Sequence, residues 1–186
     1  MVALALLAGL GACADDDTGR LTGDRLTISP CNDGPRTFEP FRCDFDRLAW
    51  IQAIDDAGTL ELRQGHRNPN ESDLMVLQFT DLPATREAWT QAPDQPLALD
   101  DDGIRVSLLL NARCPDQTQP LVARTGTLYL DAFDTGDGGR LTGRAEFDLI
   151  DARDQDNPDA EVAGSGMHLF FDLGVRRGAP HEVFSR

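Results

Sequence analysis

Strict alternation of apolar and polar residues is the feature of this sequence that most restricts its fold. It is clearest in GIRVSLLLNAR (103–113), RLTGRAEFDLI (140–150) and GMHLFFDLGVRR (166–177). In the first of these, Ile104, Val106, Leu108 and Leu110 fall on one face and the polar residues mostly on the other. Because successive side chains of a strand point to opposite faces, these segments predict antiparallel strands with one buried and one solvated side.

The rest of the chain extends this β pattern. DTGDGG (134–139) predicts a hairpin turn that pairs GTLYLDAFD with GRLTGRAEFDLID, and LPATREAWTQAP (82–93) predicts one short helix. Pro83 lies in its first turn, and Trp89 is expected to cover an open end of the core. The pattern predicts an all-β, antiparallel sandwich of about 8–10 strands, with a β-barrel as the alternative. Further strands are expected at 25–29, 46–54, 59–63, 73–80, 96–99 and 125–133.

The first residues differ in character from this domain. Val2 to Ala12 carry no charge, and the run is shorter than the ~20 apolar residues that cross a bilayer, but it has the length of a signal-peptide core. Leu10-Gly11-Ala12-Cys13 resembles a bacterial lipobox. That resemblance implies a signal peptide at 1–12, cleavage before Cys13 and lipidation of its thiol. The chain departs from the usual signal pattern because nothing before Arg20 is positively charged.

The lipoprotein resemblance carries expectations about location and organisation. Residue Ala14 after the cysteine favours the outer membrane, and residues 13–24 are expected to form a flexible acidic tether. Residues 25–186 are then one β-sandwich domain. A GxLxGxxxF pattern at 139–147 is similar to segments of uncharacterised β-rich bacterial envelope lipoproteins.

Charge narrows the range of partners. The formal net charge is −15, and all 17 basic residues are arginine. A surface this acidic repels phosphate backbones, so we expect no nucleic-acid partner. The membrane is expected to be contacted through the lipid anchor, the protein to be a monomer, and any protein or glycan partner stays unidentified.

Four cysteines raise the question of pairing. With Cys13 lipidated, Cys31, Cys43 and Cys114 remain in an oxidising compartment. The pair Cys31–Cys43 is favoured, since it closes a loop of about 13 residues worth roughly 3 kcal/mol in the chain-entropy model. Cys114 is then left over, although its pairing with either of the other two remains an alternative.

Acidic loops suggest a cation site, because Ca²⁺ prefers carboxylate oxygens on flexible loops. The richest loop supplies Asp154, Asp156, Asp159 and Glu161 as the calcium candidates, without the EF-hand spacing. No cofactor other than calcium is expected. Solvated turns explain the same residues in a chain with so many carboxylates.

Catalytic motifs are weak throughout. Ser165 lies near His168, but a nucleophile elbow requires a strand-to-helix turn that the pattern does not provide. His66 is expected in an exposed loop, and His181-Glu182 lacks the second histidine of a zinc protease motif. Trp50 and Trp89 are candidates for stacking on a sugar, with core packing favoured for Trp50. We therefore expect no catalytic residues and a non-enzymatic binding or structural module. One alternative is a calcium-dependent carbohydrate- or protein-binding module. The other is a secreted hydrolase that uses Asp/Glu carboxylates.

Overall fold

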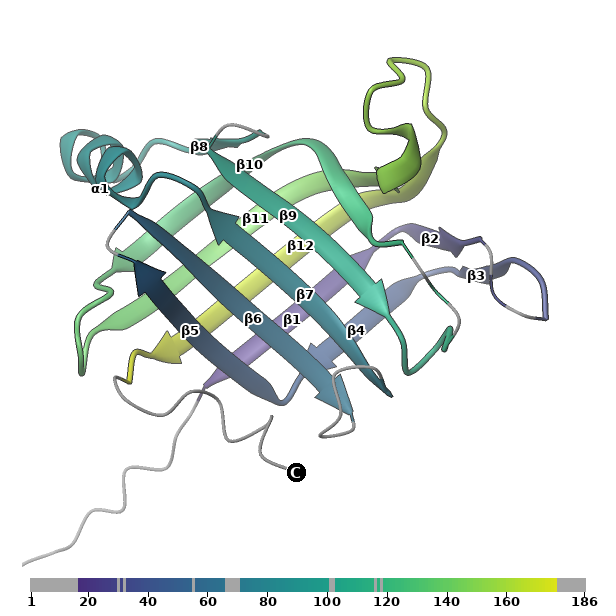
Figure 1. Cartoon of the computed structure of the whole chain (residues 1–186), viewed down its shortest axis with the longest axis horizontal. Coiled ribbons are helices and arrows are strands. Elements are labelled where there is room, and N and C mark those ends of the chain that lie inside the picture. The colour runs from purple at the N-terminus through teal and green to yellow at the C-terminus, as the bar shows by residue number, and fades with distance from the viewer. Residues whose placement is uncertain are drawn as a thin grey trace, which may run out of the picture.

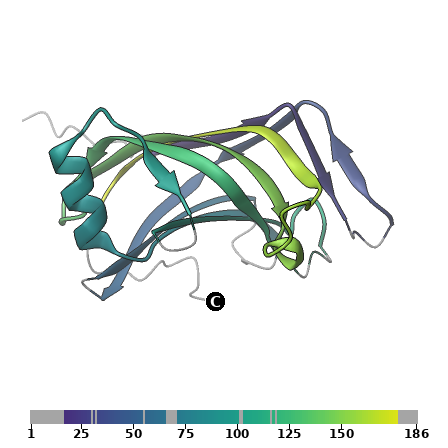
Figure 2. The same ribbon diagram turned by 90° about the horizontal axis from the view of Figure 1, so that it is seen from above.

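The computed structural model describes residues 17–29, 31, 33–54, 56–65, 71–100, 103–115, 117 and 119–176. Within them the chain forms one antiparallel sheet that folds over into two packed layers and does not close into a barrel (Figures 1 and 2). The predicted all-β sandwich is confirmed. Cys13, the expected signal peptide 1–12, His66 and His181 lie outside the described residues.

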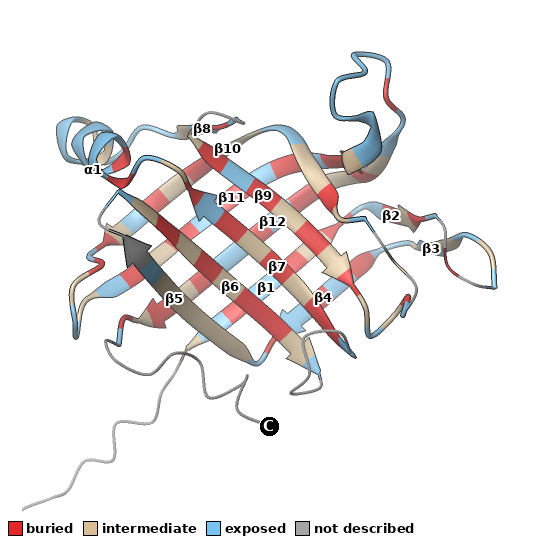
Figure 3. Cartoon of the chain, viewed as in Figure 1, coloured by how far each residue is buried: buried red, intermediate tan, exposed pale blue. Residues whose placement is uncertain are grey.

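The predicted strands and helix are found close to their expected bounds. The three most regular segments become β9 (Ile104–Leu110), β11 (Arg140–Asp151) and β12 (Val162–Gly174). Their alternation is real, since Ile104, Leu108 and the other inward residues are almost fully buried (Figure 3). The remaining predicted elements are β2 (Arg25–Ile28), β5 (Arg47–Ile54), β6 (Ala57–Gly65), β7 (Ser72–Phe79), α1 (Leu82–Gln91), β8 (Leu97–Leu99) and β10 (Leu121–Phe133).

Strand order explains how one sheet makes two layers. Neighbouring strands run β3-β2-β12-β11-β10-β9-β7-β6-β5, where β3 is Arg36–Phe38. The long β10 pairs with β11 along one edge, as the hairpin predicted, and shares its other edge between β8 and β9. Only Leu121 and Val122 pair with β9, so the sheet turns from one layer into the other at this short junction. Figure 1 shows β5, β6, β7 and β9 crossing in front of β10, β11 and β12.

Two strands that the sequence did not predict complete the rear layer. β1 (Thr18–Gly23) pairs with both β12 and β4 (Phe41–Phe45). The prediction of a flexible tether through Asp24 is therefore wrong from Thr18 onward. Leu21 is fully buried, and the Asp17 carboxylate accepts a hydrogen bond of 2.9 Å from the Gly174 backbone N–H. Burial of one apolar face explains why this polar stretch joins the sheet.

The disulfide differs from the favoured pairing. Cys31 is bonded to Cys114 across 83 residues, and Cys43 is a buried free thiol. Pairing of β4 with β1 directs Cys43 into the core, whereas Cys31 lies beside the turn that follows β9. The register of the strands, and not the short loop between Cys31 and Cys43, therefore decided which cysteines form the disulfide.

Candidate functional site

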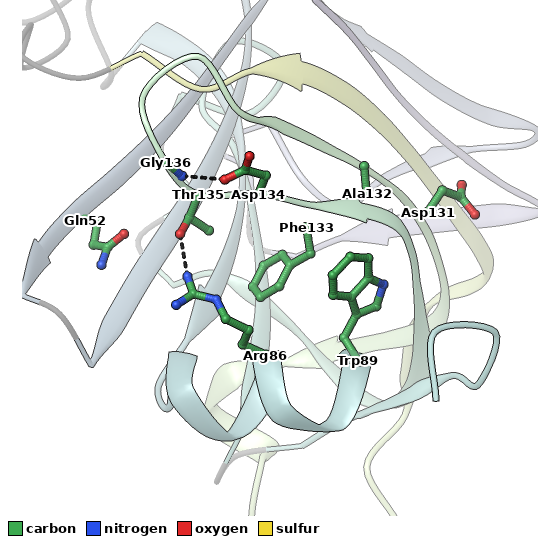
Figure 4. Close-up of a pocket in the computed structure, with 9 residues that line it drawn as sticks. All are labelled: Gln52, Arg86, Trp89, Asp131, Ala132, Phe133, Asp134, Thr135 and Gly136. Carbon is green, nitrogen blue, oxygen red and sulfur yellow. Dashed lines mark hydrogen bonds between the residues drawn. The ribbon is translucent and has the colours of Figure 1, made fainter. Parts of the chain in front are cut away.

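A hollow of about 780 Å³ opens at one end of the sandwich, between α1 and the turn that links β10 to β11 (Figure 4). A volume in this range accommodates a small organic ligand. Three separate segments supply its walls, so the hollow exists only in the folded protein. Its lining residues are Gln52, Arg86, Trp89, Asp131, Ala132, Phe133, Asp134, Thr135 and Gly136.

The helix that forms one wall is fixed at its start. The Asp81 side chain caps α1 by accepting a hydrogen bond of 2.8 Å from the Ala84 N–H, one of the donors that a helix start leaves unpaired. Leu82 donates its N–H to the Asp56 carbonyl at 2.8 Å and buries its side chain in the core. The helix is therefore held against the sandwich while most of its surface stays in solvent.

Aromatic rings form the floor of the hollow. The Trp89 indole donates from Nε1 to the Leu130 carbonyl at 2.8 Å, and its ring lies edge-on to Phe133 at 6.2 Å. Phe133 in turn contacts Phe79 and Trp50, with centroids 5.5 and 6.5 Å away. Trp89 was predicted to cover an open end of the core, and Trp50 to pack against the core; both predictions are confirmed. The hydrogen bond and the ring contact hold the indole of Trp89 in place, while the residue remains partly exposed to solvent.

Polar groups form the rim. Arg86 donates to the Thr135 hydroxyl at 2.7 Å, and the Asp134 carboxylate accepts from the Gly136 N–H at 2.9 Å. Asp131, on the far side, is paired with Arg144 at 3.4 Å. Figure 4 shows the Asp131 carboxylate turned away from Asp134, so the two acids do not converge on one point. The rim offers separated donors and acceptors beside an aromatic floor, an arrangement that orients a ligand.

The structure does not bring the four calcium candidates together. Asp154, Asp156, Asp159 and Glu161 are all exposed on the turn between β11 and β12. The turn is closed by its own hydrogen bonds: Asn157 donates its backbone N–H to the Asp154 carbonyl at 2.9 Å, and Asp159 donates its N–H to the Asn157 side-chain oxygen at 3.0 Å. In the part of the chain that the structure describes, no three His, Cys, Asp or Glu side chains gather in a group able to hold a metal ion.

Ser165 and His168 of β12 lie beside different neighbouring residues. Ser165 lies opposite Arg25 of β2, whereas His168 is exposed on the outer face with Nδ1 3.7 Å from the Glu146 carboxylate. Neither residue lines the end hollow. Their closeness in sequence therefore does not produce a nucleophile and base in contact.

A polar network at the opposite end of the sandwich was missed by the sequence reasoning. The nearly buried Asp73 carboxylate is 2.9 Å from the Arg113 guanidinium and accepts backbone N–H bonds from Ala112 and Arg113. Arg113 also donates to Gln64 at 2.9 Å, and the Cys43 thiol donates to the same oxygen at 3.0 Å. Burial raises the pKa of Asp73 against the opposing effect of Arg113, and burial raises the pKa of Cys43 to about 11. These residues come from four separate strands and turns and have no shared motif, so no local signal reveals them.

Comparison with known proteins adds no relative. No protein-family model matches the chain, and neither the curated proteins nor the solved structures contain a significant match to it. Within the described residues, no helix is long and apolar enough to span a membrane.

Proposed function

We propose that the protein is a non-enzymatic binding module whose end hollow takes a sugar ring. The observation that carries this proposal is the combination at one open site of the rigid, partly exposed Trp89 ring with separated polar groups on the rim. Sugars present an apolar face that packs on an aromatic ring, and hydroxyl groups around their edge that exchange hydrogen bonds. Arg86 and Gln52 lie where they can meet such hydroxyl groups.

Binding is favoured over hydrolysis by the arrangement of the acids. Glycoside cleavage usually requires two carboxyl groups that flank one bond from facing positions. Asp134 is engaged by the Gly136 backbone and Asp131 by Arg144, and their carboxylates point in different directions (Figure 4). The rim therefore suits recognition of hydroxyl groups better than acid–base chemistry.

The second part of the proposal is attachment to the bacterial cell envelope, with the outer membrane favoured, through lipid on Cys13. Because β1 begins at Thr18, residues 14–17 alone would link the lipid to the sheet. Even a fully extended link of this length spans less than about 20 Å. The start of β1 pairs with the end of β12, and Val175 exchanges backbone bonds with the 134–139 turn. The hollow would then face the membrane.

Intrinsic fluorescence tests the sugar site directly, since Trp50 and Trp89 are the only tryptophans. Titration with soluble glucose and N-acetylglucosamine oligosaccharides is expected to change the emission of the wild type. The change should be absent in Trp89→Phe and retained in Gln91→Ala, an exposed position on α1 outside the hollow. If millimolar saccharide leaves both the emission and the melting temperature unchanged, the proposed ligand class is wrong.

Fatty-acid labelling in cells tests the anchor. The wild type is expected to incorporate label and Cys13→Ser to lose it, with Cys43→Ser as the matched control. Label that persists in Cys13→Ser would overturn the proposed attachment.

A further inference from the structure

One row of outward side chains crosses four strands of the rear layer. Sheet register places Arg20 of β1 opposite Phe170 of β12, Phe170 opposite Arg144 of β11, and Arg144 opposite Tyr129 of β10. Phe170 is 44% exposed, which is unusual for a phenylalanine in the middle of a strand. The row therefore places an open aromatic ring between two arginines.

Both arginines are held in fixed positions. The Arg144 guanidinium lies over the Tyr129 ring, 4.6 Å from its centroid, and pairs with Asp131 at 3.4 Å. Arg20 donates to Asp44 at 2.6 Å. Stacking and pairing of this kind reduce the rotamer freedom that a ligand would otherwise have to freeze. These contacts therefore favour the observed positions of the planar donor groups beside Phe170.

This row is continuous with the end hollow. Asp131 lines the hollow, and its partner Arg144 lines a second, shallower depression of about 220 Å³ on the sheet face. Ala145, His168, Leu169 and Phe170 also line that depression. The Asp131–Arg144 pair thus stands between two concave sites that a single chain-like ligand can reach.

The charges on this face balance. Asp44 pairs with both Arg20 and Arg42, Asp131 pairs with Arg144, and Glu146 lies 3.7 Å from the His168 imidazole, so three carboxylates accompany three arginines. The whole chain carries −15, so a balanced strip is a local exception. A strip with paired charges favours an uncharged ligand rich in hydrogen-bonding groups over a polyanion or a polycation.

We propose that the ligand is an uncharged oligosaccharide that enters the end hollow beside Trp89, passes Asp131 and Arg144, and stacks on Phe170. This inference rests on the proposed sugar-binding function and extends it from one ring to a chain. Tyr129 and Phe170 are two strands apart, or about 10 Å at the usual strand spacing. Because the Arg144 guanidinium covers the Tyr129 ring, Phe170 offers the open ring at this end of the path, about the length of one disaccharide unit beyond the position of Tyr129.

A protein partner fits this face less well. Stable protein interfaces have an apolar core surrounded by a polar rim. Among the described residues, Val162 and Phe170 are the only large apolar side chains with extensive exposure, and Val162 is at the far end of β12. One ring flanked by fixed polar groups matches a sugar better than it matches a protein surface.

Calorimetric titration tests the inference with β-1,4-linked disaccharides and hexasaccharides of glucose and of N-acetylglucosamine. For the oligosaccharide that binds, the hexasaccharide is expected to bind at least about tenfold more tightly than the disaccharide, equivalent to about 1.4 kcal/mol. Phe170→Ala should remove that advantage and leave disaccharide affinity unchanged. Trp89→Phe should weaken both lengths, and Val162→Ala, an equally exposed control on the same strand, should change neither.

The outcomes separate this inference from the function on which it rests. Equal affinity for both lengths, or no effect of Phe170→Ala, would overturn the extended site and leave the end hollow as a single-ring site if Trp89→Phe still weakens binding. A tenfold loss of hexasaccharide affinity at high salt would contradict an uncharged contact. Absence of binding by every saccharide at millimolar concentration would overturn both proposals.

Discussion

The two ends of this sandwich use polar residues in opposite ways. At the end formed by the starts of β7 and β4, Asp73, Arg113, Gln64 and Cys43 bond to one another, and the adjacent disulfide joins Cys31 to Cys114. At the other end, α1 leaves a hollow with the exposed Arg86, Asp131 and Asp134 on its rim. Buried polar groups must be satisfied internally, so the first end is stabilising architecture, whereas the second has groups available to a ligand.

The difference teaches that burial, more than residue type, separates the structural site from the proposed binding site. Both ends contain arginine, aspartate and aromatic rings. Arg113 lies over Phe41, with 5.3 Å between guanidinium carbon and ring centroid, and is bonded on several sides. Arg86 is exposed, and its guanidinium donates to the Thr135 hydroxyl. The following experiments test whether stability depends on the first end and ligand binding on the second.

The largest expected loss of stability comes from removing the disulfide. In the chain-entropy model, a cross-link that spans 83 residues contributes about 4 kcal/mol to the free energy of unfolding. The double variant Cys31→Ala/Cys114→Ala should lose roughly that amount in urea denaturation. Reductant should destabilise the wild type and leave the double variant unchanged; equal effects on both would show that the bond does not stabilise the closed end.

The next largest effect is expected from Asp73→Asn. It leaves the partly buried Arg113 without its carboxylate partner, but burial already raises the pKa of Asp73, so relief of the carboxylate's desolvation offsets part of the loss and the net cost is about 2 kcal/mol. Asp73→Asn/Arg113→Met should recover part of the loss, because no uncompensated charge remains. A double-mutant cycle measured by chemical denaturation gives the coupling free energy between Asp73 and Arg113. If the effects of the two single substitutions are additive, the two side chains do not stabilise the fold as a pair.

A smaller effect on stability is expected from Trp89→Phe at the open end. The substitution removes the 2.8 Å hydrogen bond to the Leu130 carbonyl but keeps an aromatic ring, so the cost is about 1 kcal/mol. Ligand affinity should fall far more than stability does. A loss of stability as large as that of Asp73→Asn would mean that Trp89 is an architectural residue and would remove the contrast between the ends.

The smallest expected effect concerns acid. Hydrogen bonding from Arg140, helped by Thr142, lowers the pKa of Asp172, so the unfolded chain binds a proton more readily than the folded protein. Stability from this group is present above the ordinary aspartate pKa of about 3.9 and is lost as pH falls below it. Arg140 is exposed, so the contribution is under about 1 kcal/mol. Asp172→Asn should show a shallower fall in melting temperature below about pH 4; an identical slope would contradict this role.

The local pattern of apolar and polar residues predicted the strands in which one face is buried. Alternation in β9, β11 and β12 identified the faces that the core covers, and the glycine-rich 134–139 segment identified the hairpin. It missed β1, whose glycines and threonines resemble a linker, and the short strands β3 and β4. The core explains β1 and β4. Both are strands because Leu21, Phe41 and Cys43 fill the core between the layers, which is a tertiary cause.

The site was predicted only in part. Trp89 was recognised because an aromatic residue on a short helix in an all-β chain has little else to pack against. Asp131, Thr135 and Gln52 gave no signal, since each is an ordinary polar residue until folding brings β5, α1 and β10 together. The acidic loop 154–161 shows that abundant carboxylates need not converge, since its acids do not form a group able to hold a metal ion among the described residues.

By itself, the sequence determined the fold class of this protein: its apolar side chains repeat with the period of a strand, and that period is a local property of the chain. Tertiary structure alone decided which cysteines bond, which arginine is surrounded by partners and which aromatic rings meet solvent. Those outcomes depend on the register and order of strands that are far apart in sequence, because contacts between them form only when the two layers pack.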